Sequence, residues 1–392
     1  MTLQSIDPVD VGARLRAARE AAGLTQTDAA TDLRVARTTL VAMEQGRRRV
    51  RIDEIQHLAR LYGTSVNAVL RCEAAHVDLV PRFRKLSTAN DEAAERAARL
   101  LTDLVRAEVE LENLLGVTRT HNHPPARPLL PGDVRLQAEN DAIALRQWLG
   151  LGLAPVHDVI SLLELELGVR VYVRPLDSRV SGLFAYEDGV GACILLNAKH
   201  PRERQAQTGV HELGHLTSRR QTPDVCRFDQ HDDSREERYA NAFGRAFLTP
   251  ARTVTVRFQD LTAGASRFTR RHVILLAHAF GVSREAIVRR LEELGLVKRG
   301  TWDWFEAHGG ITNEQARQVL GEPVAVEPDS REAQRPVSLR LGLLAAEAQR
   351  RELLSEGQLA RLLRLDRVEL RRILDAADID GNDTNGLPKL PR

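Results

Sequence analysis

Apolar residues at helical spacing, interrupted by glycine and polar capping residues, dominate the first seventy positions. The hydroxyl of Thr25 can cap the helix that follows it, and Gly23 and Gly46 stand where helices would end. The predicted helices span 11–22, 26–33, 37–45, 52–62 and 65–70. The second and third are joined by a short turn, as in a helix-turn-helix. The pattern therefore predicts a five-helix domain of this type over residues 9–72.

Residues 91–115 again carry apolar side chains at helical spacing, and a proline-rich stretch follows them. The long helix is typical of a spacer or a dimer contact rather than of a site. The prolines between 121 and 131 indicate a linker. His121 and His123 lie in it, but a flexible segment holds metal ligands poorly, so we do not expect them to bind metal. We assign residues 73–133 to a helical spacer and linker.

From residue 134 the pattern changes to helices and short strands. Alternation over 169–173 predicts a strand, and apolar segments over 180–186 and 192–196 flank a turn, which is typical of a hairpin. Further helices are expected over 142–149, 156–167, 201–220 and 236–248. The segment 194–197 is a candidate edge strand for an extended peptide, although an ordinary core strand explains it equally well. The pattern predicts a domain over 134–300 and a fold that is mainly α with a small β-sheet (α+β).

The C-terminal quarter is helical and rich in arginine. Trp302 and Trp304 lie in 301–321, which is expected to complete the packing of the preceding domain, and 322–336 reads as a second linker. Residues 354–373, with Ser355 as a cap, repeat the helix-turn-helix pattern. Its positive charges are Arg361, Arg364, Arg367, Arg371 and Arg372. Contact with DNA and contact with a protein both fit this module. We expect a helical region over 301–378 and a disordered tail over 379–392.

The composition is that of a globular protein without a membrane segment. The chain has 392 residues, 43% of them hydrophobic and 28% charged, which suits two or three soluble domains. No apolar run approaches the roughly 18 residues needed to cross a bilayer, and the first five residues lack the features of an export signal. Three scattered cysteines argue against a disulfide framework. We therefore expect a cytoplasmic protein, nucleoid-associated when bound to DNA, without a membrane partner.

Because the net charge is only +2, binding to nucleic acid requires a local basic patch. One lies beside the third predicted helix. The exposed positions of that helix include side chains that can read base edges or hold phosphates: Arg37, Thr38, Thr39 and Gln45. The run Arg47, Arg48 and Arg49 follows directly and can contact phosphates. Most charge runs are solvated loops, but beside a helix-turn-helix this run favours double-stranded operator DNA as the partner.

His211-Glu212-Leu213-Gly214-His215 is the segment whose residues most restrict its chemistry. Two histidines four residues apart lie on one helix face, so both can bind one metal ion. Glu212 between them can reach a water molecule at the position that the metal leaves open. Such a pattern arises by chance in roughly two or three chains in a hundred of this size. The interpretation as a hydrolase therefore depends on a third ligand.

The predicted helix over 236–248 offers that ligand. Glu237 and Asn241 are four residues apart, hence on one face. We predict that Glu237 is the third ligand and that Asn241 forms a hydrogen bond with a metal-bound histidine. Glu236, which points about 100° away, and His231, which lies in a polar loop, remain alternatives. Tyr239 and His231 are close in sequence to the site, but spacing gives neither a basis as the oxyanion donor.

Both regions resemble known families. Residues 24–26, Ala29, Leu33, Ile52 and the stretch MEQGRRRV resemble the Xre-type regulator domain over about sixty residues. This resemblance implies that Gln26 contacts the DNA backbone. The segments ILLNAKHPRERQAQTGVHELGHL and EERYANAFGRAFLTP resemble the ImmA/IrrE family over roughly 142–296. Members of that family are gluzincin-like zinc metallopeptidases that act on repressor proteins.

The second resemblance implies a complete catalytic set. It assigns Zn²⁺ to His211, His215 and Glu237, with Glu212 as the general base. The chain departs from the family at two packing positions. Gly244 stands where alanine is usual, and Thr249 where methionine is usual.

Together these features predict a bacterial transcription regulator with a zinc endopeptidase domain. It would cleave a repressor-type protein, itself or a partner, in response to a signal. One alternative is a DNA-binding regulator whose metal domain senses zinc or a ligand without proteolysis. Another is an interaction protein that uses the peptidase fold as a scaffold. A homodimer is a further candidate assembly.

Overall fold

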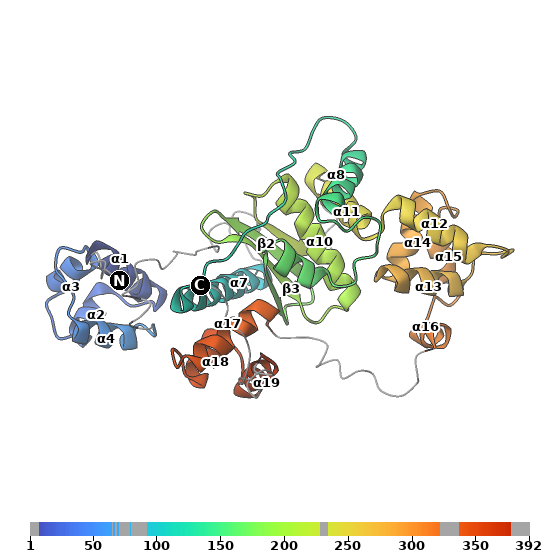
Figure 1. Cartoon of the computed structure of the whole chain (residues 1–392). Helices are drawn as coiled ribbons and strands as arrows, with labels where there is room; N and C mark the ends of the chain where they lie inside the picture. Colours follow the sequence, from blue (N-terminus) through green and yellow to red (C-terminus); the bar gives the residue numbers. More distant parts are fainter. Residues whose placement is uncertain are drawn as a thin grey trace, which may run out of the picture. The chain divides into compact units, whose positions relative to one another are not determined.

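The computed structural model describes residues 8–64, 66, 69, 79, 92–227, 234–321 and 337–377. The chain divides into two units, Met1–His76 and Val77–Arg392 (Figure 1). Among the described residues, helices predominate and a single four-stranded sheet lies in the second unit. The prediction of a mainly α fold with a small β-sheet is confirmed. None of the described helices combines the length and the apolar character needed to cross a membrane.

The first unit is a bundle of short helices around one core. Its helices are α1 (Pro8–Ala21), α2 (Gln26–Asp32), α3 (Arg37–Glu44) and α4 (Ile52–Leu61). The hydroxyl of Thr25 accepts a hydrogen bond from the backbone N–H of Asp28, and the Asp28 carboxylate accepts one from the backbone N–H of Thr25, so the predicted cap is present. Leu15, Leu40 and Leu58 are fully buried between the helices. The turn predicted over 65–70 falls largely outside the described residues.

The sheet of the second unit has the strand order β1-β3-β2-β4. Its strands are β1 (Arg170–Arg174), β2 (Val180–Glu187), β3 (Gly191–Asn197) and β4 (Asp224–Arg227). The predicted hairpin is confirmed, because β2 and β3 pair antiparallel, whereas β1 pairs parallel to β3. The prediction of an edge strand at 194–197 is wrong. The β3 strand is central because β1 covers its other side, and it is buried along its whole length.

One face of the sheet packs against a group of helices that includes the two carrying the candidate metal ligands (Figure 1). These helices are α8 (Val134–Trp148), α9 (Val159–Ser161) with the π-helical turn η1 (Leu162–Glu166), α10 (Arg202–Ser218) and α11 (Arg235–Leu248). Phe184 and Ile194 point from the strands into this core, where Val210 and Phe243 meet them. Alternate residues of the same strands point to the other face.

The opposite face is covered by α7 (Glu92–Leu115) and α17 (Leu339–Arg350). Leu101, Leu104 and Leu111 of α7 are fully buried in a core with Leu183 and Leu195 of the sheet. The helix predicted as a spacer or dimer contact is therefore one layer of the domain. In the sequence, the apolar stripe of α7 fits a dimer contact as well as a helix packed within the domain. The structure shows that the stripe packs on the sheet.

The proline-rich segment 117–133 is also more than a linker. Arg119 donates hydrogen bonds to the carbonyl oxygens of Gly168 (2.9 Å) and Val169 (2.8 Å). The backbone N–H of Arg127 donates to the carbonyl oxygen of Thr217 (2.8 Å). These bonds fasten the segment to the ends of β1 and α10. The prolines favour an extended backbone in this segment, and the hydrogen bonds hold it against the domain.

The remaining described helices come after α11 in the sequence. They are α12 (Ala251–Thr262), α13 (Arg270–Phe280), α14 (Arg284–Glu293), α15 (Thr301–Ala307), α16 (Asn313–Leu320), α18 (Glu356–Leu362) and α19 (Arg367–Ala377). Phe305 is buried in the same cluster as Phe243, and Trp302 packs on that cluster. The expected packing of 301–321 against the preceding domain is confirmed. The second linker and the tail fall outside the described residues.

Candidate functional site

His211 and His215 lie on α10, one helical turn apart, with their Nε2 atoms 3.1 Å from each other. His215 and Glu212 are fully buried, and His211 is 6% exposed. The helix forms as predicted, one residue inside its expected start and two inside its expected end. The motif therefore places both imidazoles on one face, in the interior of the domain.

Close contact between α10 and α11 brings the next ligand to the histidines. A Cβ atom on Gly214 would lie 3.0 Å from Cα of Ala240, so glycine lets the two helices cross this closely without displacing either backbone. Glu237 precedes Ala240 by three residues and Gly244 follows it by four. These three positions form the stripe of α11 that faces α10. The hydroxyl of Ser234 accepts a hydrogen bond from the backbone N–H of Glu237 and caps the helix there.

The donor atoms of Glu237 lie at the spacing that one metal ion requires. Its Oε2 is 3.3 Å from Nε2 of His211, and its Oε1 is 3.1 Å from Nε2 of His215. Two ligand atoms at zinc-bond length around a tetrahedral centre are about 3.3 Å apart. Among the other candidates, Glu236 is outside this cluster of donors and His231 falls outside the described residues. The geometry favours Glu237.

Sequence reasoning missed Asp224. Its Oδ2 atom lies 3.5 Å from Nε2 of His215, and one ligand atom from each of His211, His215, Asp224 and Glu237 lies within 4.8 Å of the others. Asp224 begins β4, and Cys226, two residues later, also lies close to the site. No helical spacing links Asp224 to the HELGH segment. An alternating strand after the helix was the only available signal.

Arg219 is the second residue that sequence reasoning missed. Its Nη2 donates to Oδ1 of Asp224 (3.0 Å) and to Oε1 of Glu237 (3.3 Å). Its Nε donates to Nδ1 of His215 (3.1 Å). One guanidinium thus bridges two carboxylates around the cluster and offsets only part of their charge. Metal binding at Nε2 of His215 puts the proton on Nδ1, so Arg219 must then turn away from this nitrogen.

The predicted contact of Asn241 with a histidine is not found among the described residues. Its side chain is exposed, whereas both histidine side chains are buried. Arg219 occupies the place at Nδ1 of His215. The physical reason is that α11 faces α10 through Glu237, Ala240 and Gly244, and Asn241 lies 100° to the side of Ala240.

Both carboxylate oxygens of Glu212 are buried and have no hydrogen-bond partner among the described residues. Burial raises the pKa of this carboxyl well above its usual range, and the negative charges of Asp224 and Glu237 raise it further. A buried, unpaired carboxyl costs free energy unless a ligand compensates it. This orphaned group fits a site that holds a cation and a water molecule. The donor set fits Zn²⁺, which prefers histidine nitrogen and carboxylate oxygen.

The electrostatics of Glu237 are opposite to those of Glu212. Burial alone would raise the pKa of Glu237, but hydrogen bonds with His211 and His215 lower it well below its usual range. Burial also lowers the pKa of His215. Glu237 is therefore ionised and His215 neutral, as metal ligation requires. Tyr239 is no oxyanion donor in this arrangement, because its hydroxyl is buried and donates to Asp141 (2.9 Å).

The predicted DNA-binding residues gather on and around α3 in the first unit. Arg37, Thr38, Gln45, Arg47 and Arg49 are exposed. Of the other predicted contacts, Thr39 is half-buried. The amide of Gln26 donates to Oε2 of Glu44 (2.9 Å) and accepts from Arg37 (3.5 Å).

Arg48 differs from its neighbours. It forms a two-pronged ion pair with Glu54, with distances of 3.0 and 2.9 Å. Glu54 is 5% exposed. The basic run therefore contains one structural arginine between two exposed ones.

Two family models match the chain. A model described as an IrrE N-terminal-like domain, of the peptidase class M78, matches residues 165–292, and one described as a helix-turn-helix domain matches 10–71. No curated protein matches the chain. The first match spans the candidate metal ligands, and the second covers α2 to α4 and all but the first two residues of α1. The chain thus combines a helix-turn-helix DNA-binding domain with an IrrE N-terminal-like, metallopeptidase-type domain.

Proposed function

We propose that the chain is a transcription regulator that binds operator DNA and carries a zinc-dependent endopeptidase. Its substrate is a repressor-type protein, either a partner or the chain itself, and a signal starts the cleavage. One observation carries the enzymatic part of this proposal: the buried carboxyl of Glu212, which has no hydrogen-bond partner in the described part of the chain, lies beside three donors at tetrahedral spacing. A purely structural metal site has no use for such a group.

In this proposal His211, His215 and Glu237 hold Zn²⁺. When bound, the ion polarises the scissile carbonyl and makes a water molecule acidic enough to attack near neutral pH. Glu212 accepts the proton of that water and passes it to the leaving amine. In the metal-free site burial raises the pKa of Glu212, and the charges of Asp224 and Glu237 raise it further. Beside a bound Zn²⁺, whose positive charge would offset these two carboxylates, the Glu212 carboxyl would ionise and could accept the proton. Burial of the site excludes other water.

The DNA-binding part of the proposal rests on α3 and the basic run after it. In a helix-turn-helix the second helix of the motif enters the major groove, so Arg37, Thr38, Thr39 and Gln45 are the proposed base-edge and phosphate contacts. Arg47 and Arg49 are the proposed phosphate contacts of the following loop. Gln26 orients Arg37 as well as offering its own amide. A DNA-binding domain and a peptidase-type domain in one chain support gene control as the purpose of cleavage.

The test compares the full chain with Glu212→Gln, both loaded with Zn²⁺, against candidate repressors and against the chain itself. The substitution keeps the shape of the side chain and removes its basicity. We expect the original chain to cut and the variant to lose at least about 100-fold in rate, the lower range for a general base. Metal content is the control, because both proteins must bind one ion. Equal behaviour of the two metal-loaded proteins on every candidate would contradict the proposal.

A second function is favoured by Asp224. With this carboxylate 3.5 Å from Nε2 of His215, the protein itself offers four donors, and a four-ligand zinc site is closed to water. In this reading the domain senses zinc or a ligand and does not cleave protein. The two functions differ in what happens when Asp224 is removed. A sensor stays inactive, whereas a latent peptidase gains activity.

A further inference from the structure

We propose that residues 337–377 form a second helix-turn-helix that binds double-stranded DNA through α19. The inference rests on a structural repeat between this segment and the first unit, where positions correspond at a constant offset of 330 (345 minus 15, for example). Neither family model covers this part of the chain. The proposal is independent of the metal site.

The turns of the two motifs have the same backbone. In the first unit, Leu33 N–H donates to Ala29 and Val35 N–H donates to Ala30; in the second, Leu363 N–H donates to Leu359 and Leu365 N–H donates to Ala360. The residue between the two donors of each turn adopts a left-handed conformation, with φ of 57° at Arg34 and 52° at Arg364. This conformation is uncommon for a residue other than glycine. Its recurrence at the matching position identifies one turn type.

The capping of the preceding helix also recurs. Thr25 and Ser355, 330 positions apart, each cap a seven-residue helix with a capping box. Their backbone angles agree, with φ and ψ of −77° and 160° at Thr25 and −75° and 159° at Ser355. Arg37 and Arg367 begin the following helices, α3 and α19.

The first helix of each motif crosses the third at matching positions. A Cβ on Gly12 of α1 would meet the carbonyl oxygen of Met43 at 2.4 Å, and one on Gly342 of α17 would lie 3.2 Å from the side chain of Ile373. Both pairs correspond at the offset of 330. Leu40 and its counterpart Leu370 are fully buried in the two cores. The three-helix unit of the first domain is therefore built a second time from α17, α18 and α19.

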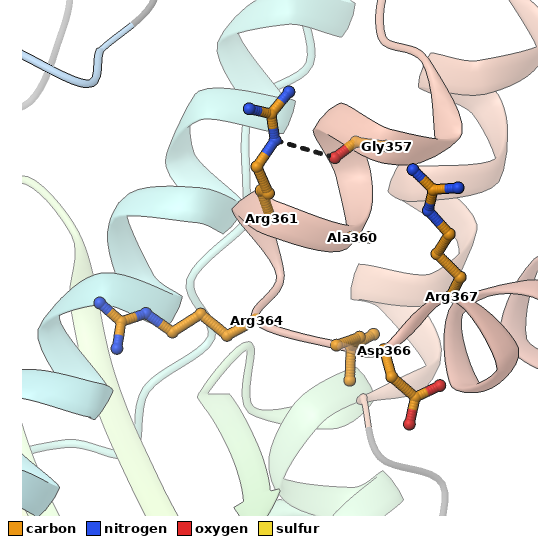
Figure 2. A pocket seen from close by; sticks show the side chains of 7 residues that line it. Gly357, Ala360, Arg361, Arg364, Asp366 and Arg367 are labelled. Atoms are coloured by element: carbon orange, nitrogen blue, oxygen red, sulfur yellow. Dashed lines mark hydrogen bonds between the residues drawn. The ribbon is translucent and has the colours of Figure 1, made fainter.

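The surface of this second motif is basic where a duplex would lie. A hollow of about 470 Å³ beside the turn is lined by Arg361, Arg364 and Arg367 together with Asp366. Figure 2 shows these side chains around the turn. Arg364 also pairs with Asp103 of α7 (2.5 Å), which fixes the turn on the domain. Asp366 accepts hydrogen bonds from the backbone N–H groups of Val368 and Glu369. Its negative charge therefore interacts with the positive end of the α19 helix dipole.

The exposed face of α19 favours DNA over a protein partner. Arg367 and Arg372 are exposed, and Arg371 pairs with Glu356 (3.0 Å). Val368, 61% exposed, is the one large hydrophobic residue strongly exposed on this helix within the described chain. A protein-docking helix presents a stripe of apolar anchors. Val368 lies among three arginines and the exposed acidic residues Glu369 and Asp375. The valine suits contact with a thymine methyl group, and Arg367 and Arg372 suit contact with phosphates.

The test uses the full chain and duplexes selected by it from a random-sequence pool. The double variant Arg367→Ala and Arg372→Ala is compared with a control of equal charge loss on α12, Arg252→Ala and Arg257→Ala. We expect the first variant to bind the selected duplexes about tenfold or more weakly, with a salt dependence smaller by about two released ions. We also expect it to lose protection of one of two half-sites. The control should match the original chain.

Lysine at both positions separates charge from folding. The variant Arg367→Lys and Arg372→Lys should restore most of the salt dependence, because the phosphate contacts need only positive charge. Circular dichroism and zinc content show that each variant is folded. Alanine variants with the affinity, salt dependence and footprint of the control would overturn the proposal, and α19 would then belong to a protein-binding surface. Failure of the peptidase proposal leaves these measurements unaffected.

Discussion

Oδ2 of Asp224 lies 3.5 Å from Nε2 of His215, close to the spacing of two ligands on one zinc ion. The aspartate comes from β4, outside the two helices that hold the other donors. Glu212 is fully buried in the same place. If Asp224 fills the fourth position around the ion, the site is closed to water until this carboxylate leaves. This consequence can be measured.

Substitution of Asp224 by alanine should separate latency from catalysis. If the carboxylate takes the fourth position, Asp224→Ala lowers zinc affinity by at least about tenfold and opens a position for water. In the cobalt-substituted variant, the visible absorption should then change when azide is added, and that of the original chain should not. The peptidase proposal further predicts faster cleavage by the variant. Identical cobalt spectra and zinc affinities would show that Asp224 is not a ligand.

Gly214 should be required for the third ligand. Gly214→Val places side-chain atoms against Ala240, where even a Cβ would lie 3.0 Å from the backbone. We expect a loss of about 1–3 kcal/mol in the free energy of unfolding, together with weaker zinc binding because Glu237 is pushed away. Gly244→Ala is the matched control on the facing helix, since its Cβ would lie 3.5 Å from the nearest atom. It should keep zinc affinity and gain up to about 1 kcal/mol in stability.

Burial should make His123 a source of pH-dependent stability. Burial lowers its pKa to about 4, and the neighbouring His121, Arg220 and Arg119 contribute to the shift. The unfolded chain therefore binds more protons than the folded chain between about pH 4 and the ordinary pKa of about 6.5. The contribution of this group to stability is full above pH 6.5 and falls as the pH drops toward 4. Because the ring is only half-buried, we expect roughly 1–2 kcal/mol.

Urea denaturation at pH 5 and pH 7 measures this effect. His123→Phe should shrink the difference in stability between the two pH values, since the ring that replaces the imidazole does not titrate. His278→Phe, on an exposed position of α13, is the control and should leave the difference intact. An unchanged difference in the first variant would mean that His123 does not resist protonation.

The three arginines after α3 should not behave alike. Arg47→Ala combined with Arg49→Ala should weaken operator binding and reduce the salt dependence by about two released ions, without loss of stability. Arg48→Ala should instead destabilise the first unit by about 1–3 kcal/mol, because it leaves the buried carboxylate of Glu54 without its partner. Thermal unfolding and fluorescence anisotropy on the same samples distinguish the two effects. Equal losses of DNA affinity and stability in all variants would refute this division.

The part of the site that follows from helical spacing could be predicted from the sequence. His211, Glu212 and His215 lie within one turn, and Glu237 is the acidic residue that reaches them from a second helix. Asn241 shows the limit of this reasoning. Residues three and four positions after Glu237 both lie near its side of the helix. The packing of Gly214 against Ala240 turns the stripe through Ala240, rather than the one through Asn241, toward α10.

Features that depend on tertiary pairing could not be predicted in this way. Asp224 meets the histidines only because β4 adds to the edge of the sheet beside β2. Arg219 lies four residues after His215 on the end of α10, but its pairing with Asp224 depends on β4. The central place of β3 follows from its parallel pairing with β1, which no local pattern records. The amphipathic pattern of α7 was visible, but the sheet that it covers was not.

The most direct test of the account is to map new protein N-termini in cells that contain either the original chain or Glu212→Gln. Each protein must be isolated from the cells that contain it with one zinc ion bound, so that metal loading is equal. We predict a cleaved repressor-type protein, or a cleaved form of the chain itself, only in cells with the original sequence. Identical sets of N-termini under the inducing condition that activates the regulator's target genes would contradict peptidase function and leave a zinc or ligand sensor.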